Sequence, residues 1–339
     1  MKYYTLNSYM QIQADINGAS AVCCPEKLYL DITEDCNLHC KMCRDNIQAD
    51  GKQLPMTLFK RLIDETSPYC KSYSLFNWGE PLILKDFKER VQYVHEKKRF
   101  DCNIEISTNG TLLNDDMINF LRAYEIRVII SIDGADKSVF EKIRCGANFG
   151  QMCENAKKLN RTYEDAFLDF APASYTSVQK ENQNELSKIA KMVSSLGFRR
   201  IGFGLVVAPM EFSPCFDEKL CLELQRAYET VRTNEMFLEM YPTRIGDYVY
   251  WGDKYVPAED FVVRTRCDAP LVSASVRYDG EVCLCCNFGA SVGNNIADKN
   301  FLDVWQSPKY NTLREAVNSP PDMPNPCRRC WWVNRWEDF

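Results

Sequence analysis

The sequence lacks the features that mark membrane, secreted and nucleic-acid-binding proteins. No apolar run approaches the roughly 20 residues that span a bilayer, and residues 1–16 lack the charged start and apolar centre of a signal peptide. There is no basic run or low-complexity segment, and the net charge of −6 gives no general attraction to nucleic acid or anionic membranes. We therefore expect a cytoplasmic protein with no nucleic-acid or membrane partner.

Cysteine, in contrast, is abundant. The chain has 17 cysteines in 339 residues, while its hydrophobic content of 45% and charged content of 26% are ordinary for a globular protein. Without a secretion signal, metal binding or redox chemistry explains so many thiols better than a disulfide framework does. We expect an oxygen-sensitive protein.

Three of the cysteines, Cys36, Cys40 and Cys43, form a C-x3-C-x2-C pattern. The apolar residues 28–33 before them predict a strand, so the pattern falls on a loop at that strand's carboxyl end. Thiolates are soft ligands that suit an iron–sulfur cluster or zinc. Three cysteines on a four-iron cube leave one iron open for a substrate or cofactor; a zinc knuckle and buried structural thiols are the alternatives.

The rest of the first two thirds of the chain alternates between strand and helix patterns, which predicts the α/β class. Strands are expected at residues 28–33, 72–77, 102–106, 126–132, 166–171 and 200–207, and helices at 57–67, 86–98, after Asn114, at 150–161, 182–196 and 217–233. Such alternation implies a parallel sheet with right-handed crossovers. Six repeats fall short of the eight that close a barrel.

The cysteine loop and the repeat number together resemble the radical S-adenosylmethionine (radical SAM) superfamily, although Met42 stands where an aromatic residue is usual. The resemblance implies an open (β/α)6 partial TIM barrel and a [4Fe–4S] cluster whose open iron chelates SAM. It also implies reductive cleavage of SAM to a 5′-deoxyadenosyl radical, which abstracts a hydrogen atom from the substrate.

The same resemblance implies a SAM site at the strand ends. Trp78-Gly79-Glu80 resembles the family's G-G-E-P motif, which binds the SAM amino group, and read alone it is a turn. Further SAM contacts are expected from Ser107, Thr108, Asn109 and Ser131, for which turn chemistry is the alternative. Arg144 is expected to pair with the SAM carboxylate or to form a surface salt bridge, and Asp133 to face the substrate.

A second group of cysteines lies near the end of the chain. Cys267 and Cys285 are spaced C-x12-G-x4-C around a predicted hairpin with an Asp279-Gly280 turn, and Cys327 and Cys330 form a C-x2-C pair. By itself this set also suits a structural zinc site. Beside the first motif it resembles the auxiliary-cluster domain called SPASM, in its short form twitch, which implies a second [4Fe–4S] cluster. Cys283 or Cys286 could replace Cys285 as the ligand.

We expect four segments: an N-terminal extension (1–26), a radical SAM core (27–233), a linker (234–266) and a twitch-type auxiliary-cluster domain of β-hairpin and helix (267–339). Residues 1–26 are too few for the peptide-recognition domain that some relatives carry. This favours a small polar substrate of the carbohydrate or aminocyclitol type, and a peptide is the alternative.

The expected reaction is oxidation of an alcohol to a ketone by a radical SAM oxidoreductase of the aminocyclitol dehydrogenase type, with a flavodoxin or ferredoxin as reductant. A fully ligated auxiliary cluster can accept an electron from the substrate radical, which favours dehydrogenation. Epimerisation of a sugar or ribosomal peptide is the alternative, with Cys286 as hydrogen donor, as is a peptide-modifying maturase. A non-catalytic metal scaffold predicts no SAM cleavage.

Overall fold

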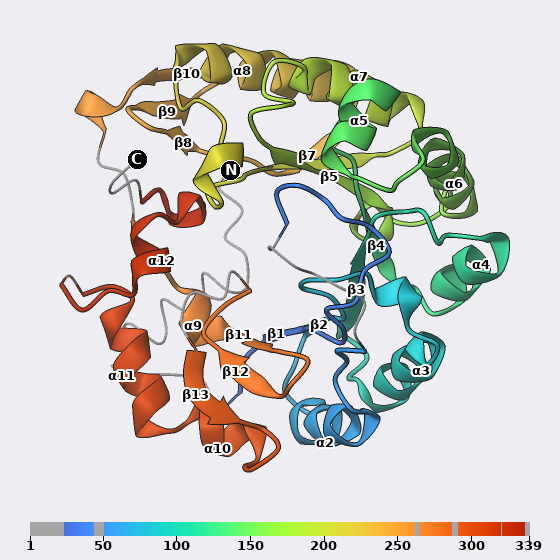
Figure 1. Ribbon diagram of the computed structural model, residues 1–339, viewed down its shortest axis with the longest axis vertical. Helices are drawn as coiled ribbons and strands as arrows, with labels where there is room; N and C mark the ends of the chain where they lie inside the picture. The colour runs from blue at the N-terminus through green and yellow to red at the C-terminus, as the bar shows by residue number, and fades with distance from the viewer. Residues whose placement is uncertain (1–23, 44–50, 262–264, 287–290, 320, 336–339) are drawn as a thin grey trace.

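The computed structural model describes residues 24–43, 51–261, 265–286, 291–319 and 321–335, so most of the predicted N-terminal extension lies outside the described residues. Its main feature is a curved sheet of ten strands in the order β13-β12-β11-β1-β2-β3-β4-β5-β6-β7 (Figure 1). Strands β1 to β7 are parallel to one another, and six of them alternate with helices, as the sequence predicts. The open (β/α)6 partial barrel is thus confirmed.

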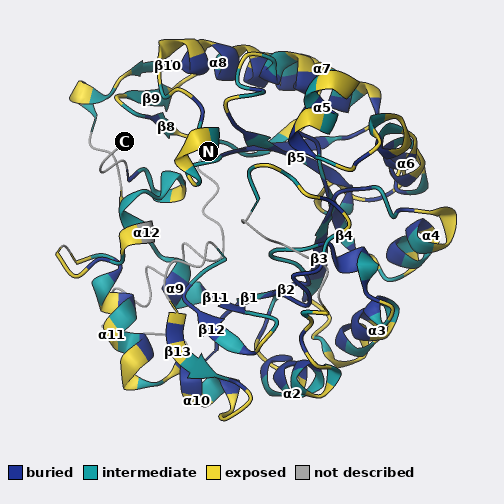
Figure 2. Cartoon of the chain, viewed as in Figure 1, coloured by how far each residue is buried: buried dark blue, intermediate teal, exposed yellow. Residues whose placement is uncertain are grey.

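The barrel strands are β1 (Lys27–Leu30), β2 (Ser72–Ser74), β3 (Asn103–Thr108), β4 (Arg127–Ser131), β5 (Ala173–Val178), β6 (Arg200–Leu205) and β7 (Phe237–Met240). The helices between them are α2 (Met56–Thr66), α3 (Phe87–Lys97), α4 (Asp115–Ala123), α5 (Lys137–Ile143), α6 (Phe149–Thr162), α7 (Leu186–Ser195) and α8 (Glu218–Thr233). Their apolar stripes pack against the outer face of the sheet, where the buried residues gather (Figure 2).

Two helix starts follow the capping rules that the sequence suggests, whereas α2 starts at Met56 without a side-chain cap from Thr57. The Asn114 side chain accepts a hydrogen bond from the Met117 amide at the start of α4. Asp217 does the same for α8, where it accepts from the Leu220 amide. Each cap satisfies one of the amides that a helix start leaves without a partner, which fixes where the helix begins.

The predicted fifth strand is wrong. Residues 166–171 contain the 3-10 turn Leu168–Phe170, and the strand starts only at Ala173. Phe167 is 85% exposed, so its apolar side chain does not belong to a strand core. Pro172 lacks an amide proton and separates the turn from β5, whose small and polar residues alternate too weakly to signal a strand.

The segment predicted as a linker contains ordered strands. Strand β7 adds to the edge of the barrel sheet, and β8 (Arg244–Ile245), β9 (Tyr248–Trp251) and β10 (Lys254–Pro257) form a separate antiparallel sheet. The division of the chain into four segments stays a prediction. Among the described residues, no helix has both the length and the apolar character needed to cross a bilayer.

The predicted C-terminal hairpin forms and extends the barrel sheet. Strand β11 (Ser273–Val276) pairs parallel to β1, β12 (Glu281–Cys283) runs back antiparallel to β11, and β13 (Ser291–Asn295) follows at the edge. Helices α9 (Ala269–Val272), α10 (Phe301–Trp305), α11 (Pro308–Ala316) and α12 (Asn325–Arg328) accompany it. In Figure 1, α11 and α12 lie on the side between the two ends of the sheet.

This register places the two cysteine groups at opposite ends of β1. Cys36 follows the carboxyl end of β1, whereas Cys283 is level with Ser275 and hence with Tyr29. Because β12 runs antiparallel to β11, Cys285 lies further toward the amino end of β1. The inner face of the barrel therefore separates the first cysteine group from the second.

Candidate functional site

The first three cysteines lie on a short loop after β1. The Leu38 amide donates to the Cys36 thiol at 3.4 Å, and the Cys43 amide donates to the Cys40 carbonyl at 3.1 Å. The charges of the Cys36 and Cys43 thiols both act on Cys40, so the three thiols lie near one another. Burial raises the pKa of the Cys40 thiol to about 12, while the nearby Arg144 charge opposes the rise. A positively charged iron cluster would hold these thiols as thiolates.

The donor set fits a cluster. In the described part of the chain, no group of three or more Cys, His, Asp or Glu side chains is gathered closely enough to hold a single metal ion. The cysteines of a [4Fe–4S] cube each bind a different iron, so they stand further apart than the ligands of one zinc ion do. Three half-buried thiols near one another match the cluster.

The W-G-E-P turn packs directly onto the chain that leads into Cys36. Gly79 has a φ of +72°, and a Cβ built on it would lie 2.4 Å from the Thr33 carbonyl oxygen. The Glu80 amide donates to the Asp35 carbonyl at 2.8 Å, and the Trp78 amide donates to the Asp31 carboxylate. Only glycine permits this approach, so Gly79 positions the cysteine loop by backbone contact.

The Glu80 carboxylate connects this turn to the end of β3. It accepts hydrogen bonds from the Thr108 hydroxyl at 2.8 Å, the Asn109 amide at 2.8 Å and the Leu82 amide at 3.2 Å. The side chain is 1% exposed, and burial raises its pKa to about 7, although these hydrogen bonds and the Arg144 charge oppose the rise. A carboxylate has about four acceptor sites, so Glu80 retains capacity for a further donor.

The remaining predicted SAM contacts gather at the same end of the barrel. The Asn109 side chain donates to Asn37 on the cysteine loop at 2.9 Å, and Asn37 in turn donates to Thr111. Ser107 and Ser131 are half-buried near the ends of adjacent parallel strands. The structure therefore brings Trp78, Gly79, Glu80, Ser107, Thr108, Asn109 and Ser131 together around the cysteine loop; their contacts to SAM stay predictions.

Asp133 and Arg144 form a buried ion pair. Arg144 Nη2 lies 2.7 Å from Asp133 Oδ2, and the Ser177 amide donates to the other Asp133 oxygen at 2.7 Å. Asp133 is 0% exposed, so the structure gives its predicted substrate contact no support, and that role stays a prediction. Arg144 is 8% exposed, which excludes the surface salt bridge as its setting.

The C-terminal cysteines lie near one another, and their role as cluster ligands stays a prediction. The Cys285 charge acts on the thiols of Cys267, Cys327 and Cys330. Burial raises the pKa of Cys267 to about 12 and that of Cys327 to about 11. Cys283 is buried on β12, whereas the Cys285 charge acts on all three of the other thiols, which favours Cys285 as the fourth ligand. Four cysteines near one another suit a fully ligated cluster.

Two residues that sequence reasoning missed hold this group together. Asn318 exchanges hydrogen bonds of 2.8 and 2.9 Å with the Cys267 backbone. The buried Arg335 donates to the Asn318 side chain at 2.7 Å and to the Cys327 carbonyl at 3.2 Å, and its own amide donates to the Cys330 carbonyl. Only the position of Arg335, shortly after the C-x2-C pair, hinted at this role.

Cys286 follows Cys285 directly and lies near Tyr29 of β1. The charges of Cys285, Lys27 and Cys330 act on its thiol, and so does Tyr29. The Cys286 charge acts in turn on Tyr175, a residue of β5. Burial raises the pKa of the Cys286 thiol to about 12, so the group holds its proton at neutral pH. Tyr29 and Tyr175 carried no motif in the sequence.

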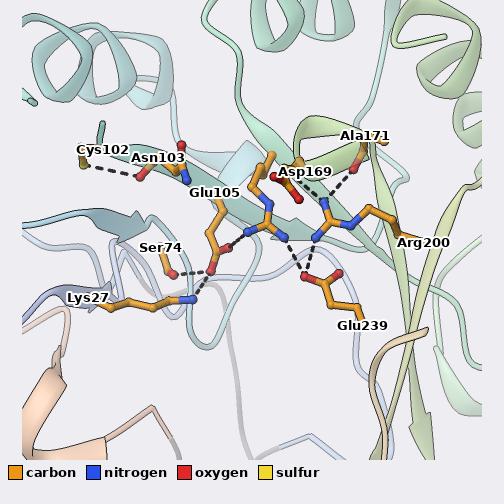
Figure 3. A network of polar contacts seen from close by, with 10 residues as sticks. Lys27, Ser74, Cys102, Asn103, Glu105, Asp169, Ala171, Arg200 and Glu239 are labelled. Carbon is orange, nitrogen blue, oxygen red and sulfur yellow. Dashed lines mark hydrogen bonds and ion pairs between the residues drawn. The ribbon is translucent and has the colours of Figure 1, made fainter. Parts of the chain in front are cut away.

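A chain of alternating charges crosses the amino ends of the strands (Figure 3). Lys27 pairs with Glu105 at 2.6 Å, Arg127 lies between Glu105 and Glu239, and Glu239 also pairs with Arg200. Burial tends to raise the pKa of Glu105, but the Lys27 charge, the hydrogen bonds from Lys27 and Ser74 and the Arg127 charge together lower it. This network joins five strands of the barrel, and the register places its member Glu105 level with Tyr29.

Comparison with known families agrees with this site. The model of the radical SAM superfamily matches residues 30–202, and the model of SPASM, an iron–sulfur cluster-binding domain, matches residues 267–331. The chain belongs to the radical SAM superfamily and carries a SPASM-type domain, so its cofactors are [4Fe–4S] clusters and SAM.

Individual relatives are distant in sequence. The chain is 24% identical over 311 residues to the tungsten-containing aldehyde ferredoxin oxidoreductase cofactor-modifying protein of Pyrococcus furiosus, covering 85% of this chain and 82% of that protein. It is 24% identical over 331 residues to the mycofactocin maturase of Mycolicibacterium smegmatis, covering 90% and 75%. It is 28% identical over 203 residues to a cysteine-type anaerobic sulfatase-maturating enzyme of Clostridium novyi, covering 55% and 50%.

The fold is shared with solved structures. SuiB of Streptococcus suis bound to S-adenosylmethionine superposes with a TM-score of 0.66 at 17% identity, over 93% of this chain and 75% of that chain. At this identity the likeness shows the fold alone. In this shared fold, as Figure 1 shows for the present chain, the barrel strands and the C-terminal hairpin belong to one sheet.

Proposed function

We propose that this radical SAM enzyme modifies a residue of a peptide or protein. The observation that carries this proposal is its sequence similarity to a mycofactocin maturase across 90% of the chain. A sulfatase-maturating enzyme matches over about half of the chain. SuiB, which shares the fold, has also been solved with its precursor peptide, so this fold admits a peptide in that protein.

The sequence-based preference for a carbohydrate or aminocyclitol substrate rested on the short N-terminal segment. The relatives above are named for maturation and cofactor modification, and none of these names mentions a sugar alcohol. They therefore favour the peptide alternative over the small-molecule substrate. A flavodoxin or ferredoxin as reductant and a cytoplasmic location stay predictions.

The inner face of the barrel is the proposed substrate site. When bound at the first cysteine group, the cluster and SAM supply the radical that abstracts a hydrogen atom. Between that group and the auxiliary cysteines lie the half-buried side chains of Tyr29, Tyr175 and Cys286. In our proposal these three side chains contact the substrate residue, and the buried walls around them exclude water.

We propose oxidation as the outcome. The substrate radical formed by hydrogen abstraction loses one electron and one proton, so the substrate loses two hydrogen atoms in all. An auxiliary cluster held by four cysteines would have no open iron, which suits it to accept the electron rather than to bind the substrate. Its proposed ligand Cys285 directly precedes Cys286, whose charge acts on Tyr29 and Tyr175.

One observation favours a second outcome. The Cys286 thiol holds its proton and lies near Tyr29, so it can donate a hydrogen atom to a substrate radical. The thiyl radical left on Cys286 then takes up one electron from the external reductant and one proton, which restores the thiol. Donation from the opposite face would invert the carbon centre, which is epimerisation. Turnover in heavy water separates the outcomes: deuterium gained at carbon by the wild type but not by Cys286→Ala would establish epimerisation and overturn oxidation.

The substrate class is tested by offering the reduced enzyme peptides encoded beside its gene and, separately, sugar alcohols and aminocyclitols. We expect a peptide to lose the mass of two hydrogen atoms for each 5′-deoxyadenosine formed. Turnover of a sugar alcohol or aminocyclitol, with every peptide unchanged, would contradict the proposal. The Cys36/Cys40/Cys43 triple alanine variant is the control, because it should leave every substrate unchanged.

A further inference from the structure

The cysteine loop is fastened to the segment that follows α5. The His39 amide donates to the Cys145 carbonyl at 2.9 Å, and the Lys41 amide donates to the Ile143 carbonyl at 3.1 Å. Cys145 and Ile143 are the two chain neighbours of Arg144, and His39 and Lys41 are the two chain neighbours of Cys40. They therefore hold Arg144 and Cys40 opposite each other.

The Arg144 side chain is aimed at Cys40 by buried partners. Nη2 pairs with Asp133 at 2.7 Å, and Nη1 lies 4.0 Å from the Cys40 sulfur, at the outer limit of an N–H···S contact. Asp133 is fixed in turn, because the Ser177 amide donates to its carboxylate and Asn182 donates to its carbonyl at 3.0 Å. The direction of the guanidinium is thus set by β4, β5 and the loop after β5.

One further nitrogen of Arg144 remains available. Nε is buried and has no hydrogen-bond partner among the described residues. A buried donor without a partner is costly, so such a group usually faces a ligand or water. Arg144 also acts electrostatically on Cys36, Cys40 and Cys43 together. Its position therefore suits the whole cysteine group rather than Cys40 alone.

We infer that Arg144, held by Asp133, is a positioning residue that raises the reduction potential of the cluster on Cys36, Cys40 and Cys43. Reduction adds one negative charge to a cluster that already has three thiolate ligands. A fixed positive charge and an N–H donor beside a ligand sulfur stabilise the reduced state more than the oxidised state. In this inference Asp133 acts on the cluster through Arg144.

This inference rests on the proposed function, since it takes those three cysteines as the SAM-cluster ligands. It differs from the expectation that Arg144 pairs with the SAM carboxylate. The two are separable because the potential of the cluster can be measured without SAM. The expected carboxylate contact would change only the affinity for SAM.

The test is a redox titration of the reconstituted full-length protein without SAM, followed by electron paramagnetic resonance. The signal that is missing in the Cys36/Cys40/Cys43 triple alanine variant belongs to the SAM cluster. Arg144→Gln should lower the midpoint potential of this cluster. At the wild-type midpoint the ratio of reduced to oxidised cluster should fall about tenfold, which corresponds to a shift of 59 mV for one electron. Arg144→Lys should give a smaller shift, because lysine keeps the charge without the planar fork.

Two further variants keep the test decisive. Asp133→Asn/Arg144→Gln leaves no buried charge behind and should still lower the midpoint, less than Arg144→Gln does, because Arg144 is nearer to the cluster. Arg122→Gln removes an arginine that pairs with Asp165 at 3.0 Å on the surface and should leave the midpoint unchanged. The resonance signal comes only from protein that holds a cluster, so partial loss of iron does not obscure the result.

The inference would be overturned by a midpoint that stays at the wild-type value in both Arg144→Gln and the double variant. A lower SAM affinity with an unchanged midpoint would overturn it in favour of the carboxylate contact. A wild-type protein without the triple-variant-sensitive signal would instead show that the proposed cluster site is wrong.

Discussion

The carboxylate of Glu80 accepts a hydrogen bond of 2.8 Å from the backbone amide of Asn109. This bond joins the turn after β2 to the end of β3, and Asn109 continues the connection to Asn37 on the cysteine loop. Glu80 is thus both part of the predicted SAM site and part of the structure that shapes it. Its charge state should affect binding and stability in different ways.

SAM binding is predicted to depend on the protonation of Glu80. Its pKa is raised to about 7 by burial, so the group is largely protonated below that pH in the SAM-free protein. A SAM ammonium requires the carboxylate as acceptor. The affinity for SAM should therefore weaken about tenfold per pH unit below pH 7 and level off above it. Calorimetric titration of the reconstituted protein between pH 6 and 8 measures this.

Two variants check that the pH dependence comes from Glu80. Glu80→Gln should bind SAM more weakly at pH 8 and show no pH dependence over the same range. Glu80→Ala should weaken SAM binding while both clusters stay in place. Unchanged SAM affinity in both variants would show that the carboxylate does not contact SAM and serves only to hold Thr108 and Asn109.

Stability of the cofactor-free chain should show the opposite pH trend. The folded pKa of Glu80 lies above its unfolded value, so its contribution is fully present below about pH 4.5 and is lost as the pH rises through 7. From pH 4 to pH 8 the free energy of unfolding should fall by about 3 kcal/mol more in the wild type than in Glu80→Gln. Urea unfolding at several pH values measures it, and parallel curves for the two proteins would contradict it.

Gly79→Ala should disrupt the cysteine loop. A methyl group there would lie 2.4 Å from the Thr33 carbonyl oxygen and would also require a positive φ. We expect iron to be lost from the SAM cluster while the auxiliary cluster remains. Gly252→Ala is the matched control, since Gly252 also has a positive φ but no atom within 4 Å of the added methyl. Equal iron content in the two variants would refute the close-contact argument.

The metal content should be about eight irons per chain, as two cubes. The Cys36/Cys40/Cys43 triple alanine variant should hold half of that iron and cleave no SAM. Iron analysis with parallel zinc analysis measures this. About four irons with one zinc in the wild type would refute the auxiliary cluster and favour a structural zinc site at Cys267, Cys285, Cys327 and Cys330.

Arg335→Ala should release the auxiliary cluster selectively. Arg335 connects Asn318, the Cys327 carbonyl and the Thr265 carbonyl, so its loss frees the backbone of two ligands. We expect iron to fall toward the SAM-cluster content. Arg226→Ala removes an exposed arginine that pairs with Glu223 and should leave the iron unchanged. Full iron content in Arg335→Ala would show that the cysteines hold the cluster without this support.

The sequence was most informative where chemistry depends on local spacing. Both cysteine groups, the W-G-E-P turn and the six-repeat barrel follow from neighbouring residues, since each depends on short-range patterns. The burial of Asp133 could not be predicted from neighbouring residues, because it depends on the ion pair with Arg144, which lies after α5. Strand β5 was misplaced because its inward side chains are small or polar. The place of Tyr29 beside the C-terminal cysteines could be recognised only from the pairing of β1 with β11.

The most direct test of the account is reductive SAM cleavage. The protein is reconstituted anaerobically with iron and sulfide, reduced with dithionite and incubated with SAM, and 5′-deoxyadenosine is measured by chromatography. We expect the wild type to form 5′-deoxyadenosine and the Cys36/Cys40/Cys43 triple alanine variant to form none. An iron-replete wild type that forms no 5′-deoxyadenosine would contradict the account and favour a non-catalytic metal scaffold.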